Sequence, residues 1–245
     1  MKILVCISQA PDTTSRIAFT DGDKAFDSSG VQYIVNPYDE WYALVRAIEL
    51  KEQQGGSVTT LTVGGAECDP IIRKALAIGA DDAIRIDANP QDSMQVARLI
   101  SDHARSESFD IILCGKETID HNGSVVPAMV AELLDLPFVA LATCLEVEGT
   151  IGKMNREVGG GEESIEVSMP FVASAAKGMA EQRIPNMRGI MSARSKPLNV
   201  LEASVEAATS VSKFTLPPVK GACKMIDADR PEELIRLLRE EAKAI

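Results

Sequence analysis

Short apolar runs alternate with amphipathic segments through the first half of this chain, and this alternation is the feature that most restricts its fold. The runs have the length and the Val/Ile/Leu content of strands, and the segments between them repeat apolar residues every three or four positions. We expect strands at residues 2–7, 31–35, 57–63, 83–86 and 111–114, and helices starting near residues 36–39, 69, 93 and 127. This repetition predicts an α/β protein with a mostly parallel sheet covered by helices on both faces.

Three of the predicted strands end in polar or glycine residues. They are followed by Ser8-Gln9, by Gly64-Gly65 and by Gly115-Lys116. Because ligands of parallel sheets bind outside the carboxyl ends of the strands, we expect these three segments to meet at one crevice. Asn36 follows the strand at residues 31–35 and should lie beside that crevice, where Asn36 or Asp39 can cap the next helix.

The segment at residues 109–127 contains the best candidate for a ligand site. A buried strand ends at Gly115, a polar loop follows, and a helix begins near residue 127. At such a junction, unpaired N–H groups and the positive end of the helix dipole can hold a phosphate. Asn122, Gly123 and Ser124 suit that role, because they cap helices or let a ligand approach the backbone. The loop is neither a Walker A loop nor a GxGxxG motif, and an ordinary βα connection has a similar composition, so both interpretations stay open.

Composition excludes several classes of function. A formal net charge of −11 and an aromatic content of 4% argue against nucleic acid as a partner, because each phosphate contact needs a cation. The five cysteines form no CxxC pair and the two histidines have no motif around them, so neither a metal site nor histidine-based catalysis is expected. No apolar run is long enough to span a bilayer and no signal peptide is visible, which predicts a cytoplasmic protein without membrane insertion.

Beyond residue 137 the helical periodicity is replaced by period-two alternation. Residues 138–143, 145–149, 164–169 and 170–175 have the pattern of strands, and the middle two read as half exposed. Three consecutive glycines at residues 159–161 mark a tight turn. We therefore expect an antiparallel hairpin added to the sheet.

Residues 177–197 combine basic and apolar side chains in a loop-like stretch. Composition leaves two interpretations open: the Met and Ile residues form an adaptable contact surface, or they pin a long connection to the core. Residues 199–227 read as an extended arm leading to a short helix, which starts with a capping-box pattern at Asp229 and Glu232. We therefore divide the chain into an α/β domain at 1–198 and a C-terminal arm at 199–245, which should lie on the parent domain or on a partner subunit.

Five segments together resemble the β subunit of electron transfer flavoproteins, a family that includes nitrogen-fixation paralogues. They are Val35-Asn36-Pro37-Tyr38-Asp39, residues 72–81 (IRKALAIGAD), residues 115–120 (GKETID), residues 156–163 (REVGGGEE) leading to Pro170, and residues 183–194 (RIPNMRGIMSAR). Each segment is weak alone, but all five occur in the family's order and the likeness runs nearly end to end. The resemblance implies a Rossmann-like sheet of the adenine nucleotide alpha-hydrolase type.

The resemblance also implies a function. The chain would be an electron-carrier subunit, without bond-making chemistry of its own, in a heterodimer with a larger α subunit. The α subunit would hold the working FAD, and this β subunit would bind AMP in a structural role. Electrons would pass from flavin dehydrogenases, such as acyl-CoA dehydrogenases, to a membrane quinone reductase, the ETF-quinone oxidoreductase.

Site residues follow from the same resemblance, carried over position by position. The AMP site would comprise Cys6, Asn36, Pro37, Tyr38, Asp39, Val63, Gly64, Gly115, Lys116, Glu117, Thr118, Ile119, Asp120, His121, Asn122, Gly123, Ser124, Val125 and Val126. The dehydrogenase-recognition loop would fall on residues 183–196, with Met187 as its apolar anchor and with docking residues Arg183, Ile184, Met187, Arg188, Ile190, Met191 and Arg194. Arg156 and Glu157 match the segment that faces the mobile flavin domain.

Two departures from the family pattern and two alternatives accompany this reading. Gly159 stands where the family usually has an acid, and the loop after Asp120 is less polar, so backbone N–H groups and Ser124 would have to hold the anion. A bifurcating branch carries a second FAD in place of AMP; residues 9–13 (QAPDT) resemble that branch, whereas the loop favours AMP. A stand-alone adenine-nucleotide-binding protein or ATP-cleaving enzyme would instead need Mg²⁺ ligands near Gly115, where only Glu117 and Asp120 are available.

Overall fold

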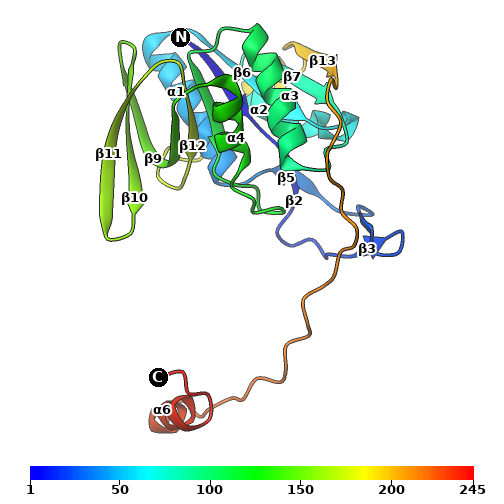
Figure 1. Cartoon of the computed structure of the whole chain (residues 1–245), viewed down its shortest axis with the longest axis vertical. Coiled ribbons are helices and arrows are strands. Elements are labelled where there is room, and N and C mark those ends of the chain that lie inside the picture. Colours follow the sequence, from blue (N-terminus) through cyan, green and yellow to red (C-terminus); the bar gives the residue numbers. More distant parts are fainter.

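A nine-stranded sheet runs through the protein in the computed structural model, which describes residues 1–245 (Figure 1). In the order in which they lie side by side, its strands are β11 (Gly161–Ser168), β10 (Ile151–Val158), β9 (Phe138–Glu148), β12 (Phe171–Ala175), β8 (Ile111–Gly115), β1 (Lys2–Cys6), β6 (Ser57–Val63), β7 (Asp82–Asp87) and β13 (Leu198–Glu202). All pairs from β9 to β13 are parallel, and the pairs β9–β10 and β10–β11 are antiparallel.

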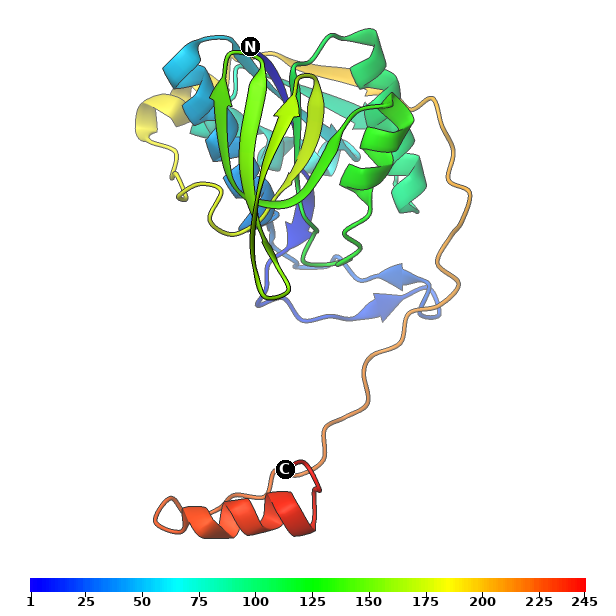
Figure 2. The same ribbon diagram turned by 60° about the vertical axis from the view of Figure 1, so that its left-hand side comes forward.

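Helices cover both faces of the parallel part of the sheet. On one face lie α1 (Asp39–Gln54), α2 (Asp69–Ile78) and the short α5 (Met187–Ala193), and on the other lie α3 (Ser93–Ser106) and α4 (Val126–Leu134) (Figures 1 and 2). Their apolar residues form two separate core clusters with the sheet between them. Because both faces are covered, the central strands are apolar throughout, and all five residues of β8 are buried. The predicted α/β class is confirmed.

The order of the strands places a topological switch point at the centre of the sheet. From β1 the chain moves outward through β6 and β7, and then returns to the other side of β1 to form β8. The connections on the two sides of β1 therefore diverge beyond the carboxyl ends of β1 and β8. In open α/β sheets this divergence leaves a crevice for ligands.

The antiparallel addition is also confirmed. Strands β9, β10 and β11 form a long ribbon that extends beyond the parallel strands, with its tip at residues 159–160 (Figure 2). The sequence predicts two strands at residues 138–143 and 145–149, but β9 is one continuous strand of eleven residues. Its pairing with β10 and with β12 shifts register once on each side, and the strand runs through both shifts. Two small antiparallel ribbons, β2 (Gln9–Pro11) with β5 (Tyr33–Val35) and β3 (Phe19–Thr20) with β4 (Ala25–Phe26), lie between β1 and α1.

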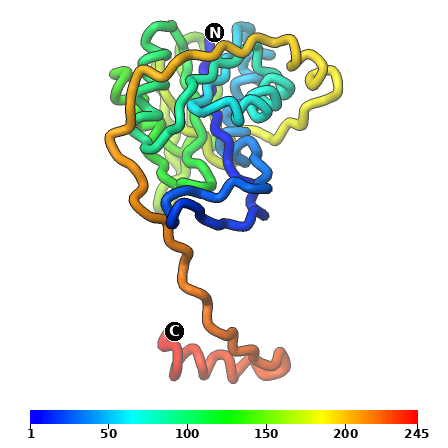
Figure 3. Tube along the Cα trace, turned by 90° about the vertical axis from the view of Figure 1, so that its right-hand side faces the viewer, coloured from blue at the N-terminus to red at the C-terminus, as the bar shows by residue number.

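The C-terminal region differs from its prediction in two respects. The boundary predicted after residue 198 falls inside β13, which pairs with β7 at the edge of the sheet, so the arm begins only at residue 203. Helix α6 (Pro231–Glu240) lies apart from the body (Figure 3). Asp229 does not cap it: the N-cap is Arg230, with no side-chain bond, while the N–H of Asp229 donates to Asp227. None of the helices has the length and apolar character that crossing a bilayer requires.

Candidate functional site

Gly115 brings the end of β8 against the first turn of α1. A Cβ atom at this position would lie 2.8 Å from the backbone nitrogen of Glu40 and 2.7 Å from its Cγ, distances that side chains do not adopt. Glycine is therefore required for the close approach of strand and helix. The contact lies beside the β1–β8 switch point.

Asn36 joins the segment before α1 to the loop after β8. Its Oδ1 accepts the N–H of Ile119 at 3.0 Å, and its Nδ2 donates to the carbonyl of Glu117 at 2.9 Å. The side chain is fully buried by these contacts. The prediction that Asn36 or Asp39 caps α1 was wrong, because the N-cap is Tyr38, with no side-chain bond, and the Asn36 amide is used across 81 to 83 positions of sequence.

The loop at residues 115–126 has the backbone features of an anion site. The N–H of Asn122 donates to the carbonyl of Thr118, and Asn122 and Ser124 have φ angles of 47° and 54°. The N–H groups of residues 123–126 donate to no protein acceptor, and they precede the N-terminus of α4, where the helix dipole is positive. The Ser124 hydroxyl donates to Glu117 Oε2 at 2.9 Å, so in this conformation the backbone groups are the free donors.

Two carboxyl groups lie at the same switch point, beside Ser8 and Gly115. Glu40 is buried, and its two oxygens accept the N–H and the hydroxyl of Ser8 at 2.7 and 2.8 Å. Burial raises the pKa of Glu40 to about 8, against the opposing effect of these two bonds. Burial likewise raises the pKa of Asp39 to about 6, although Lys116 opposes the shift. Both acids therefore resist ionisation in a site where a phosphate would bring further negative charge.

Glu40 gives this site a pH dependence with a defined sign. A carboxyl whose folded pKa is raised stabilises the fold fully below its unfolded pKa of 4.5, and that contribution is lost as the pH rises through about 8. Each pKa unit is worth about 1.4 kcal/mol, so the loss has an upper limit on the order of 5 kcal/mol. We expect Glu40→Gln, which stays neutral and can still bond Ser8, to keep its stability between pH 6 and 9 while the parent loses stability.

Denaturant unfolding at several pH values measures this difference. Glu146→Gln, which alters an exposed carboxylate on β9, is the matched control and should follow the parent curve. Parallel curves for the parent and Glu40→Gln would contradict the assignment.

Three more residues of the predicted AMP site lie next to strand ends or at the start of α1. Cys6 is the last residue of β1 and is buried. Its thiol has a raised pKa, mainly because of the hydrogen bond with the Cys114 side chain and secondly because of burial. Gly64, after β6, is packed against Cys68, since a Cβ would lie 2.4 Å from its Sγ. Tyr38 is 63% exposed and has a strained φ of 65° beside the crevice.

Sequence reasoning missed Glu40. The sequence did contain a signal for a buried acid at this position. Glu40 directly follows Asn-Pro-Tyr-Asp and lies on the face of α1 that packs against the sheet.

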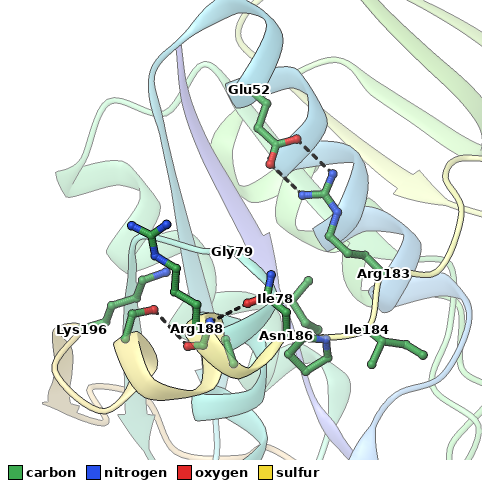
Figure 4. A pocket seen from close by; sticks show the side chains of 12 residues that line it. Glu52, Ile78, Gly79, Arg183, Ile184, Asn186, Arg188 and Lys196 are labelled. Atoms are coloured by element: carbon green, nitrogen blue, oxygen red, sulfur yellow. Dashed lines mark hydrogen bonds and ion pairs between the residues drawn. The ribbon is translucent and has the colours of Figure 1, made fainter.

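Polar contacts fix the course of residues 183–196 on α1 and α2. Arg183 forms a bidentate ion pair with Glu52 at 2.7 and 3.0 Å (Figure 4), and its carbonyl accepts from Trp41 Nε1. Arg73 donates to the carbonyls of Ala193 and Lys196. An open groove of about 470 Å³ remains between this segment and the C-terminal ends of α1 and α2.

The apolar side chains of residues 177–197 divide between the two interpretations. Met179 is buried in the core and pins the connection there, whereas Ile184, Met187 and Met191 are 80%, 73% and 69% exposed and do not. The segment is not wholly a loop either, because Asn186 caps the short helix α5 by accepting the N–H of Gly189 at 2.8 Å. Ile190, Arg188 and Arg194 are exposed as well, and neither arginine forms an ion pair, whereas Arg183 is neutralised by Glu52.

Arg156 and Glu157 lie on β10 near the tip of the long ribbon. Arg156 pairs across the ribbon with Glu163, at 2.7 Å, and Glu157 stands opposite Glu162. The tip therefore carries more acidic than basic side chains.

A parallel sheet with a switch point, and with an anion-type loop and a helix N-terminus beyond it, defines a doubly wound α/β protein. The model of the electron transfer flavoprotein domain matches residues 23–206, and the chain belongs to that family. Over the full length of both chains it is 36% identical to the electron transfer flavoprotein subunit beta of Bacillus subtilis. It is 37% identical to the subunit of that name from Syntrophomonas wolfei, with 99% of this chain and 96% of the relative covered. A third relative is the acryloyl-CoA reductase electron transfer subunit gamma of Anaerotignum propionicum, at 29% identity over 98% and 99% of the two chains.

Proposed function

We propose that this chain is the β subunit of a heterodimeric electron transfer flavoprotein and binds AMP in the crevice between β1 and β8. The observation that carries the proposal is the coincidence of the residues implied by the family with the topological switch point. Asn36, Gly115 and the loop at residues 115–126 come together there through bonds between distant segments. The free N–H groups of residues 123–126 are the phosphate donors, and the neutral Glu40 keeps the wall of the crevice from repelling the nucleotide.

The α subunit holds the working FAD in this proposal, and the β chain contributes no bond-making step. The β chain instead contributes a body stabilised by the nucleotide, a C-terminal arm that contacts the α subunit, and a docking surface at residues 183–196 for the dehydrogenase that donates electrons. The acidic ribbon tip with Arg156 and Glu157 faces the mobile flavin domain. Flavin dehydrogenases deliver electrons and a membrane quinone reductase, the ETF-quinone oxidoreductase, accepts them.

One observation favours a second candidate, the bifurcating subunit with a second FAD in place of AMP. Gln9, in the segment that resembles that branch, has a buried Oε1 without a protein partner at the exit of β1. A ligand with a donor group could satisfy it.

The nucleotide content of the purified heterodimer tests both candidates. We expect one equivalent of AMP and one of FAD after extraction. Two equivalents of FAD without AMP would establish the bifurcating form, and a chain that bound no nucleotide and no α subunit would contradict both.

The exposed side chains of residues 183–196 lead to a docking prediction. Met187→Ala should weaken the complex with the donor dehydrogenase roughly ten- to a hundred-fold, because a buried apolar anchor of this size is worth about 1.5–3 kcal/mol. Flavin content and folding should not change, since Met187 is exposed in this chain. The measurement is steady-state electron transfer at increasing dehydrogenase concentration.

Two further variants separate anchoring from steering. Neutralising Arg188 or Arg194 should lower the association rate most strongly at low salt. Val200→Ala removes an exposed apolar side chain from the edge strand β13 and should leave transfer unchanged. Equal transfer by Met187→Ala and the parent at every salt concentration would exclude the docking role.

A further inference from the structure

The first part of the C-terminal arm is fastened to the body by the N-terminus of α3. One oxygen of Asp92 accepts the N–H of Gln95 at 2.7 Å and so caps the helix. Its other oxygen accepts the N–H groups of Ala208 and Thr209 at 2.9 and 2.8 Å, and the Thr209 hydroxyl at 3.1 Å. The N–H of Gln95, and then that of Thr209, lower the pKa of Asp92, which keeps this carboxylate ionised. One side chain thus holds both a helix end and the arm.

Gln95 adds a second bond from the same helical turn. Its Nε2 donates to the carbonyl of Val205 at 3.1 Å, while its Oε1 accepts the N–H of Gln91. The Val205 side chain packs against the apolar cluster under α3. These contacts fix residues 205–209 along the N-terminal end of the helix.

The β3–β4 ribbon provides a separate attachment point further along the arm. The ring of Phe214 stacks on that of Phe19, with 5.0 Å between centroids and 13° between planes. The N–H of Phe214 donates to the carbonyl of Asp23 at 2.7 Å, and Lys213 Nζ lies 3.8 Å from the carboxylate of Asp23. Beyond Phe214 no hydrogen bond or ion pair joins the arm to residues 1–214, and the chain runs away from the body (Figures 2 and 3).

We propose that Asp92 with Gln95, and Phe19 with Asp23, form a two-point clamp that fixes residues 205–214 before assembly and sets the direction in which residues 215–245 leave the body. The inference rests on the proposed heterodimer, whose α subunit is the partner that the free part of the arm meets. Because the clamped residues are already ordered, only the free part loses conformational freedom on binding. The clamp therefore raises the affinity of the chain for the α subunit, although the clamp residues themselves make no contact with that subunit.

Two substitutions open the clamp while sparing the fold. Asp92→Ser keeps a good N-cap for α3 but removes the oxygen that accepts from the arm. Phe214→Ala removes the stacked ring. Asp12→Ser is the matched control, since Asp12 accepts from Thr14 in a similar local turn and has no contact with the arm.

The first readout is hydrogen exchange at the amides of Ala208, Thr209 and Phe214 in the full chain, dissociated from its partner. We expect protection in the parent and in Asp12→Ser, and loss of protection at Ala208 and Thr209 in Asp92→Ser. Unprotected amides in the parent would overturn the clamp.

The second readout is the dissociation constant of the heterodimer. The double variant Asp92→Ser/Phe214→Ala should bind the α subunit at least about tenfold more weakly, mainly through slower association. An unchanged constant, despite loss of amide protection, would overturn the role in assembly. Failure of the parent to bind any α subunit would instead contradict the proposed function, and the amide protection would still decide whether the clamp exists.

Discussion

We expect Gly123→Val to empty the nucleotide site while the fold remains intact. A Cβ at Gly123 would meet only Val125 Cγ2 at 3.8 Å and Ser93 Oγ at 3.9 Å, both ordinary contacts, and its backbone does not need the left-handed region. A valine side chain there would occupy the space in front of the free N–H groups of residues 123–126, where the phosphate is proposed to bind. Purified heterodimer of this variant should contain FAD but substantially less than one equivalent of AMP.

Gly115→Ala should fail in a different way. Its Cβ would press against the backbone of Glu40, so β8 and α1 must separate, at a cost of about 1–3 kcal/mol. We therefore expect loss of AMP together with a lower melting temperature. Gly159→Val, at the open ribbon tip, is the control in which neither should change. Full AMP content in Gly123→Val would show that the loop at residues 115–126 does not hold the phosphate.

The gathering of the strand ends at one edge of the sheet could be predicted from the sequence because strand exits are encoded locally. Apolar runs that end at Ser8, Gly64 and Gly115 mark the carboxyl ends of strands, and the parallel order brings those ends to one edge. The role of Asn36 could not be predicted in this way. An asparagine before a helix has the same local sequence whether it caps that helix or, as here, bonds a loop some 80 residues away.

The C-terminal half was harder to predict for a related reason. Helix α5 has only seven residues and includes Gly189, so its own propensity is weak; its position depends on the contact of Gly189 with the carbonyl of Ala77, where a Cβ would lie 2.3 Å away. The sequence predicts an arm from residue 199 onward, inside β13, because this strand lies at the sheet edge, is exposed along most of its length and so lacks the continuous apolar run of a buried strand. Its pairing with β7 is a tertiary contact that the pattern of its own residues does not show.

Deleting residues 215–245 should abolish assembly with the α subunit and leave the body folded. A ten-residue helix such as α6 is marginal in isolation, and here it exposes Leu234 and Ile235 to solvent, which makes it a surface that a partner must cover. The deletion starts after the last contact with the body, at Phe214. A deletion from Val200 onward would also remove β13 and could lower affinity simply by damaging the sheet. Co-purification with a tagged α subunit measures the effect, and circular dichroism of the truncated chain checks its fold.

Point substitutions in α6 can distinguish a specific contact from the mere presence of the arm. Leu234→Glu with Ile235→Glu keeps good helix formers but removes the apolar face. Each buried aliphatic side chain is worth about 1.5–3 kcal/mol, so the pair should weaken the heterodimer at least a hundred-fold. Arg239→Gln, an exposed polar change on the same helix, should have little effect. If the truncated chain and the double variant both kept the parent affinity, the α subunit would have to be held by the body alone, and the arm would need another partner.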